Sequence, residues 1–130
     1  MADGRYIAGK CNIGKNEIRK RYILSVFGFI LTGLLTFFIV YLNLNSIYGF
    51  LVFISLVIGF EGFYQGHFKF CAGLAAEGVY DLTGSGGTRG KVNSKKAHNL
   101  DIKSAIQIHI YSLISSLPAE LAVFLIIHYV

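Results

Sequence analysis

The chain has 130 residues, of which 54% are apolar and only 15% are charged. An average soluble domain carries roughly 25% charged residues, and a small one must leave much of its surface in water. This composition excludes a disordered chain and an ordinary water-soluble domain. We therefore expect a single all-α membrane domain over residues 1–130.

The first spanning helix is predicted over residues 17–42. The run from 22 to 42 carries no charge, and 21 helical residues extend about 31 Å, close to the thickness of a hydrocarbon core. Asn16 is expected to cap this helix, with Glu17 favourable in its first turn. Residues 1–16 are expected to form a cytoplasmic N-terminal segment that is retained, because the run after it is too long for a signal peptide.

A short polar connection at residues 43–46 predicts a tight turn before the second spanning helix. The chain is free of charge from 47 to 60, which is too short to span, so this helix must carry Glu61 into the membrane. We predict it over residues 47–66, with an extension to 77 as the alternative, where Gly78 would end it.

Glycine and lysine dominate residues 78–104, which predicts a flexible cytoplasmic loop. The third spanning helix is predicted over residues 105–129, with Pro118 as a kink site near its middle. Three crossings place the N-terminus and this loop on one side of the membrane. The 43–46 turn and the C-terminus then lie on the other side.

The cationic residues identify which side is cytoplasmic. All twelve lysines and arginines fall before the apolar run of residues 22–42 or between residues 69 and 103. The positive-inside rule therefore predicts a cytoplasmic N-terminus and an outside C-terminus in a multi-pass protein of the cell (cytoplasmic) membrane. We expect these residues to contact anionic lipid at the cytoplasmic face, and we expect no nucleic acid, since no recognition fold accompanies the charge.

Every predicted span carries small residues at helical spacing, which let helix backbones approach closely in lipid. They allow two hypotheses: one compact three-helix hairpin, or a spare stripe on the second helix that receives a membrane protein partner or a second copy. The small residues are Gly28, Thr32, Ser55, Gly59, Gly62, Gly66, Ser112 and Ser116.

Ionisable residues inside predicted spans are candidate functional groups, because burying a charge in lipid is costly. Depth estimates place Glu61 in the cytoplasmic third of the membrane and Glu120 in the outer third, too far apart for a carboxylate pair. Gln107 and His109 share the depth of Glu61 and Gln65, and we predict a contact between Glu61 and His109. A structural role and proton or ion translocation involving Glu61 and Glu120 are both open.

Two cysteines, Cys11 and Cys71, are predicted to lie near the same membrane face. His67 precedes Cys71 by four residues and shares one side of a helix with it. The three form a candidate thiol or metal site, although they lack the usual metal-ligand spacing. The alternative is that both cysteines are small residues at structural boundaries.

Two motifs carry a resemblance: C-N-I-G-x-x-E-I-x-x-R at residues 11–21 and F-x-F-C at residues 68–71. With the order of the spans, they resemble a group of uncharacterised small prokaryotic integral membrane proteins. The resemblance implies the three-span architecture and that Cys11 and Cys71 belong together. It implies no activity, substrate or cofactor.

No phosphate-binding loop and no Ser/His/Asp constellation is recognisable in the sequence. The leading hypothesis is therefore an accessory or scaffolding subunit of a larger membrane complex. The alternatives are a cytoplasm-facing thiol-redox or metal-binding membrane protein that uses Cys11 and Cys71, and the translocation hypothesis above.

Overall fold

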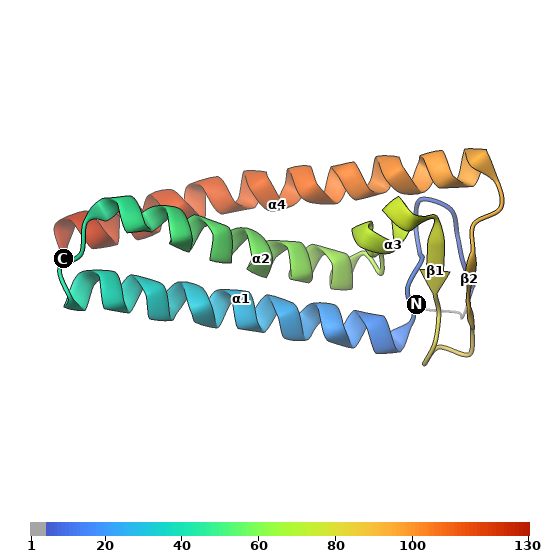
Figure 1. The fold of residues 1–130 in the computed structure, drawn as a ribbon, viewed down its shortest axis with the longest axis horizontal. Coiled ribbons are helices and arrows are strands. Elements are labelled where there is room, and N and C mark those ends of the chain that lie inside the picture. Colours follow the sequence, from blue (N-terminus) through green and yellow to red (C-terminus); the bar gives the residue numbers. More distant parts are fainter. Residues whose placement is uncertain (1–4) are drawn as a thin grey trace.

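The computed structural model describes residues 5–130, which fold into three long helices with a small mixed layer at one end. The helices are α1 (Lys15–Tyr41), α2 (Gly49–His67) and α4 (Lys95–Tyr129), and a single 3-10 turn, η1 (Ser46–Tyr48), precedes α2. They lie side by side with α2 between the other two (Figure 1). Each is long and apolar enough to cross a membrane, which is compatible with a multi-pass membrane protein.

The short elements gather at the end of the bundle where α1 begins (Figure 1). They are α3 (Ala72–Glu77) and an antiparallel hairpin of β1 (Val79–Asp81) and β2 (Arg89–Lys91). We call residues 5–14 and 68–104, which include these elements and the first turns of α4, the cap. The turn between α1 and α2 and the C-terminus lie at the opposite end of the bundle.

Helix α1 begins two residues earlier than expected, and its N-cap is Gly14 rather than Asn16. The backbone N–H of Asn16 donates to the carbonyl of Thr83, at 3.3 Å, so Asn16 already belongs to the first turn of the helix. The helix start is therefore held by the cap and not by the Asn16 side chain.

The alternative in which the second helix continues to residue 77 is wrong. Helix α2 ends at His67, and Lys69 has a left-handed φ of +56° that reverses the chain. The N–H of Phe70 then donates to the carbonyl of Gln65 at 2.9 Å, which closes the helix end. Helix α3 is thus a separate element, and Gly78 (φ +71°) ends this short helix rather than an extended second one.

The prediction of a flexible loop over residues 78–104 is also wrong. This segment forms the hairpin and the start of α4, which begins at Lys95 instead of residue 105. The hydroxyl of Ser94 caps this helix by accepting from the N–H of Ala97 at 3.3 Å. Lysine is a good helix former, so the basic segment extends the third helix beyond its apolar run.

Most of the buried apolar side chains form two clusters, one near each end of the bundle. Large apolar side chains otherwise point outward on all three long helices, for example Phe27 and Ile114 at 58% and 61% exposure. In lipid this outward surface is favourable. The cluster under the cap contains Phe70, Ala72, Ala75, Ala105 and Ile108, and the other contains Ile39, Val52 and Leu56.

Glycine residues allow the backbones of helices α1 and α2 to approach each other closely. A Cβ added at Gly28 would lie 2.5 Å from the backbone N of Gly59, and one at Gly62 would lie 2.7 Å from the carbonyl oxygen of Arg21. A Cβ at Gly66 would lie 3.1 Å from the ring of Tyr22. Both small-residue stripes of α2 therefore face α1, and neither is left free for a partner, as the second hypothesis required.

The predicted small hydroxyl residues are buried at the helix contacts. Thr32 of α1 and Ser55 of α2 form a hydrogen bond of 2.7 Å across the helix pair. Ser112 and Ser116 of α4 are fully buried and donate to the carbonyls four residues earlier, at 2.9 and 2.7 Å. These bonds satisfy the hydroxyls within the protein, without a water molecule.

Candidate functional site

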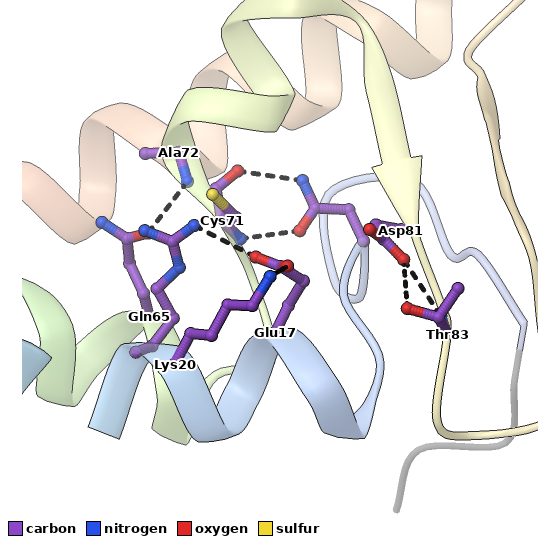
Figure 2. A network of polar contacts seen from close by, with 9 residues as sticks. Glu17, Lys20, Gln65, Cys71, Ala72, Asp81 and Thr83 are labelled. Carbon is purple, nitrogen blue, oxygen red and sulfur yellow. Dashed lines mark hydrogen bonds and ion pairs between the residues drawn. The ribbon is translucent and has the colours of Figure 1, made fainter. Parts of the chain in front are cut away.

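Asn12 ties the N-terminal segment to the rest of the cap. Its side chain is fully buried, accepts from the N–H of Cys71 at 2.7 Å, and donates to the carbonyl of Cys71 at 3.0 Å (Figure 2). The backbone of Asn12 also pairs with Lys69 (3.2 Å) and Asp81 (2.9 Å). One side chain thus satisfies both backbone groups of Cys71 where the chain enters α3.

Asp81 joins the hairpin to the N-terminal segment and closes its own turn. Its carbonyl accepts from the N–H of Gly14 at 2.7 Å. Its carboxylate accepts from the hydroxyl and the N–H of Thr83, at 2.7 and 3.1 Å (Figure 2). The Thr83 hydroxyl is the main cause that holds the pKa of Asp81 below its ordinary value.

A second group of hydrogen bonds joins the N-terminal segment to α4. Asp101 is fully buried and accepts from the hydroxyl of Tyr6 at 2.5 Å and from the N–H of Gly9 at 2.7 Å. The hydroxyl of Ser104 donates to the carbonyl of Gly9 at 2.5 Å. Tyr6 also stacks on Tyr80 of β1, and burial raises the pKa of its phenol, which therefore stays a donor.

All lysines and arginines of the chain lie in or beside the cap, at one end of the bundle. In the first turns of α1, Glu17 is largely buried and pairs with two of them, Lys20 at 2.7 Å and Arg21 at 3.3 Å (Figure 2). One carboxylate is thus shared by two cations, so this site keeps a positive excess.

Just below the cap, the predicted contact between Glu61 of α2 and His109 of α4 is confirmed. Nδ1 of His109 contacts Oε1 of Glu61, and Nε2 of Gln65 lies 3.2 Å from the same oxygen. Oε1 of Gln65 accepts from the N–H of Ala72 at 3.4 Å (Figure 2). Gln65 therefore links this polar cluster to the start of α3.

An open cavity of about 660 Å³ adjoins the cluster. Its residues come from all four helices, and its polar side chains are of both signs. The residues that line it are Arg21, Val57, Glu61, Gln65, Cys71, Ala72, Gly73, Leu74, Ala76, Glu77 and His109. We call this the subcap cavity. A mixed set of charged groups in a concave space is a candidate binding site.

Two of the predicted cluster residues lie elsewhere. Gln107 is exposed and lines a separate cavity of about 130 Å³. Glu120 lies near the other end of the bundle, beside Gly49 at the start of α2, and its Oε2 is buried without a hydrogen-bond partner among residues 5–130. Twelve helical residues, about 18 Å, separate Gly49 from Glu61. The two glutamates therefore do not form one site, as their depths indicated.

The candidate metal site of Cys11, His67 and Cys71 is not formed, because residues 5–130 contain no group of three or more His, Cys, Asp or Glu side chains placed to hold a metal ion. Both cysteines are free thiols. Cys71 is only 2% exposed, the thiol of Cys11 contacts the carbonyl oxygen of Ile13, and His67 stacks on Phe63. A joint thiol role for Cys11 and Cys71 stays a prediction.

Sequence reasoning missed several residues of the cap and its cavity. Asp101 is the only acidic residue between 89 and 103, a signal that could have indicated a specific hydrogen-bonding or ionic role. Arg21 ends both the basic run before the apolar segment 22–42 and the motif at residues 11–21, but neither pattern predicts that it lines a cavity. Glu77 carries no distinguishing pattern in the sequence.

Comparison with known proteins adds no relative, because no protein-family model, no curated protein and no solved structure matches this chain. The resemblance to small prokaryotic membrane proteins therefore stays a prediction based on the two motifs. Function has to be argued from the cap and the subcap cavity.

Proposed function

We propose that this protein is a three-span integral membrane subunit that serves a larger membrane assembly as an accessory or scaffolding component. Its three long helices supply the spans, and their outward apolar side chains supply the lipid contact. We place the cap in the cytoplasm, since it gathers the basic residues and cytoplasmic segments carry an excess of Lys and Arg.

The observation that carries this proposal is the construction of the cap. Four chain segments meet there through buried polar side chains, Asn12 and Asp101 above all. Such a network holds one defined surface instead of a set of loose loops. A rigid basic surface at one end of a small membrane anchor suits docking to an anionic lipid layer or to an acidic partner surface.

The sequence-based alternatives have less support. Thiol chemistry needs an accessible thiolate, whereas Cys71 is buried. Translocation between Glu61 and Glu120 would need a path along the bundle, and the serines between them, Ser112 and Ser116, are buried and bonded within their own helix.

Native mass measurement after gentle solubilisation of the tagged full chain from its own membrane tests the proposal. We expect particles that contain this chain and a stoichiometric membrane partner. Replacing three exposed cap lysines (Lys95→Gln, Lys96→Gln, Lys103→Gln) is expected to release that partner, whereas Asn99→Ala leaves the cap charge and the complex unchanged. A lone folded protomer that retains no partner contradicts the proposal.

A further inference from the structure

The subcap cavity combines groups of both charges where the cap meets the apolar part of the bundle. Its floor is a stripe of α2, formed by Val57, Glu61 and Gln65 at four-residue spacing. Arg21 of α1 and His109 of α4 contribute from the two flanking helices, and α3 covers the end toward the cap. The site is thus assembled from segments far apart in the sequence.

The two carboxylates of the cavity, Glu61 and Glu77, have oxygen atoms that are free to accept further hydrogen bonds. Both contacts to Glu61 fall on Oε1, and no hydrogen bond to its Oε2 is made by any residue from 5 to 130. Glu77 lines the same cavity and is exposed on α3. Two carboxylates with free oxygens suit a primary ammonium group, which donates up to three hydrogen bonds.

The positive part is the guanidinium of Arg21. It shares Glu17 with Lys20, and its one hydrogen bond there, from Nη2, is long at 3.3 Å. Its Nε is buried and has no hydrogen-bond partner among the described residues. A guanidinium with unused donors is well suited to a phosphate group, which it can bind through two hydrogen bonds.

From this arrangement we infer that the subcap cavity binds the headgroup of a zwitterionic phospholipid with a primary amine, of the phosphatidylethanolamine type. Arg21 binds the phosphate, and Glu61 and Glu77 bind the ammonium. Val57 and Leu74 line the same cavity, so the glycerol and the first acyl carbons meet apolar surface. This inference rests on the proposed membrane location and adds a lipid partner to it.

Lipid retention by the purified full chain tests the inference. The protein is reconstituted with equal amounts of phosphatidylethanolamine, phosphatidylcholine and phosphatidylglycerol, extracted gently, and analysed by native mass spectrometry. We expect preferential retention of one phosphatidylethanolamine per chain. Phosphatidylcholine carries a quaternary ammonium that cannot donate, and phosphatidylglycerol carries none. Arg21→Gln and Glu61→Gln are each expected to lower this retention about tenfold.

Two further variants separate binding from folding. Glu77 is exposed, so Glu77→Gln keeps the fold and is expected to weaken retention of the amine lipid specifically. Arg19→Gln removes the same charge two residues from Arg21 and outside the cavity, and is expected to change nothing. Unchanged far-UV circular dichroism establishes that each variant is folded.

Equal retention of the three lipids, or retention of none, overturns the inference. Preferential phosphatidylglycerol binding that depends on Arg21 but not on Glu61 also overturns it, in favour of a simple anion site. Carbonate extraction of the chain from membranes would instead contradict the proposed function, so the two failures are distinguishable.

Discussion

Asn12 is the residue whose side chain does most to assemble the cap. It is fully buried and occupies both backbone groups of Cys71. Asn12→Ala would leave the buried N–H of Cys71 without a partner, which costs about 1–3 kcal/mol, whereas the carbonyl of Cys71 would still accept from the N–H of Ala75 at 3.1 Å.

We therefore predict that Asn12→Ala lowers the free energy of unfolding by about 1–3 kcal/mol, measured by chemical unfolding in detergent micelles. Asn99→Ala is the control, because Asn99 is exposed on α4. Equal stability of the two variants would mean that Asn12 does not hold the cap together.

Asp81 makes the hairpin sensitive to acid. The hydrogen bond from the Thr83 hydroxyl is the largest effect on the pKa of its carboxyl and lowers it. Burial raises this pKa, but by less than the hydroxyl bond lowers it. The Thr83 N–H and the charges of Arg89 and Lys20 lower it further. A carboxyl whose pKa is lower in the folded state stabilises that state above its unfolded pKa, about 3.9. This stabilisation is lost as the pH falls through the folded pKa.

We predict that amide protection in β1 and β2, followed by hydrogen exchange and corrected for intrinsic rates, drops below about pH 4. Asp81→Asn keeps an acceptor for Thr83 but does not titrate, so this variant should lose the acid-dependent part of the change. The assignment to Asp81 fails if wild type and Asp81→Asn lose protection in parallel.

At the scale of elements, the close contact between α1 and α2 depends on glycine residues, which have no side chain to separate the helices. A Cβ at Gly28 would meet backbone atoms of Gly59 and Ser55 at 2.5 to 3.0 Å, and backbone cannot rotate away as a side chain can. Gly33, on the same helix, has no atom within 4 Å of the corresponding position apart from its own chain neighbours and the nearby helix backbone.

Gly28→Ala is expected to push the two helices apart and to cost about 1–3 kcal/mol of stability, seen as a lower midpoint of thermal unfolding in detergent. Gly33→Ala should be neutral or slightly stabilising, because alanine favours helix more than glycine does. If both variants unfold at the same temperature, the helices are not as close as the structure has them.

The elements that the sequence predicts best are the three long helices, because an uninterrupted apolar run of about 20 residues is typical of a spanning helix. The boundaries of α1 and of α2 differ from the predictions by only one or two residues. The hairpin and the early start of α4 escaped prediction, since glycine and lysine content indicates a loop. The actual structure of this segment depends on long-range partners, such as Asn12 with Asp81 and Tyr6 with Asp101.

The candidate site was predictable only in part for the same reason. Glu61 and His109 could be paired because depth along a helix follows from counting residues. Arg21 could not be added, since its place in the cavity depends on how α1 is rotated against α2. That rotation follows from the glycine contacts, which involve two helices at once.

For the whole molecule, the separation of charge from apolar surface is the main physical property. Basic residues lie at one end of a bundle whose long sides are apolar, and the opposite end carries the α1–α2 turn and the C-terminus (Figure 1). If the helices cross the membrane, both basic segments must face the same compartment. Our proposed function depends on this sidedness.

Cysteine accessibility in sealed right-side-out membrane vesicles tests this sidedness most directly. Lys10→Cys, Lys95→Cys and Leu44→Cys are introduced one at a time into a chain that carries Cys11→Ser and Cys71→Ala, and are treated with a membrane-impermeant maleimide; all three positions are exposed. We predict that position 44 is labelled in intact vesicles and that positions 10 and 95 are labelled only after lysis. Labelling of positions 10 and 95 from opposite faces would contradict the three-span arrangement.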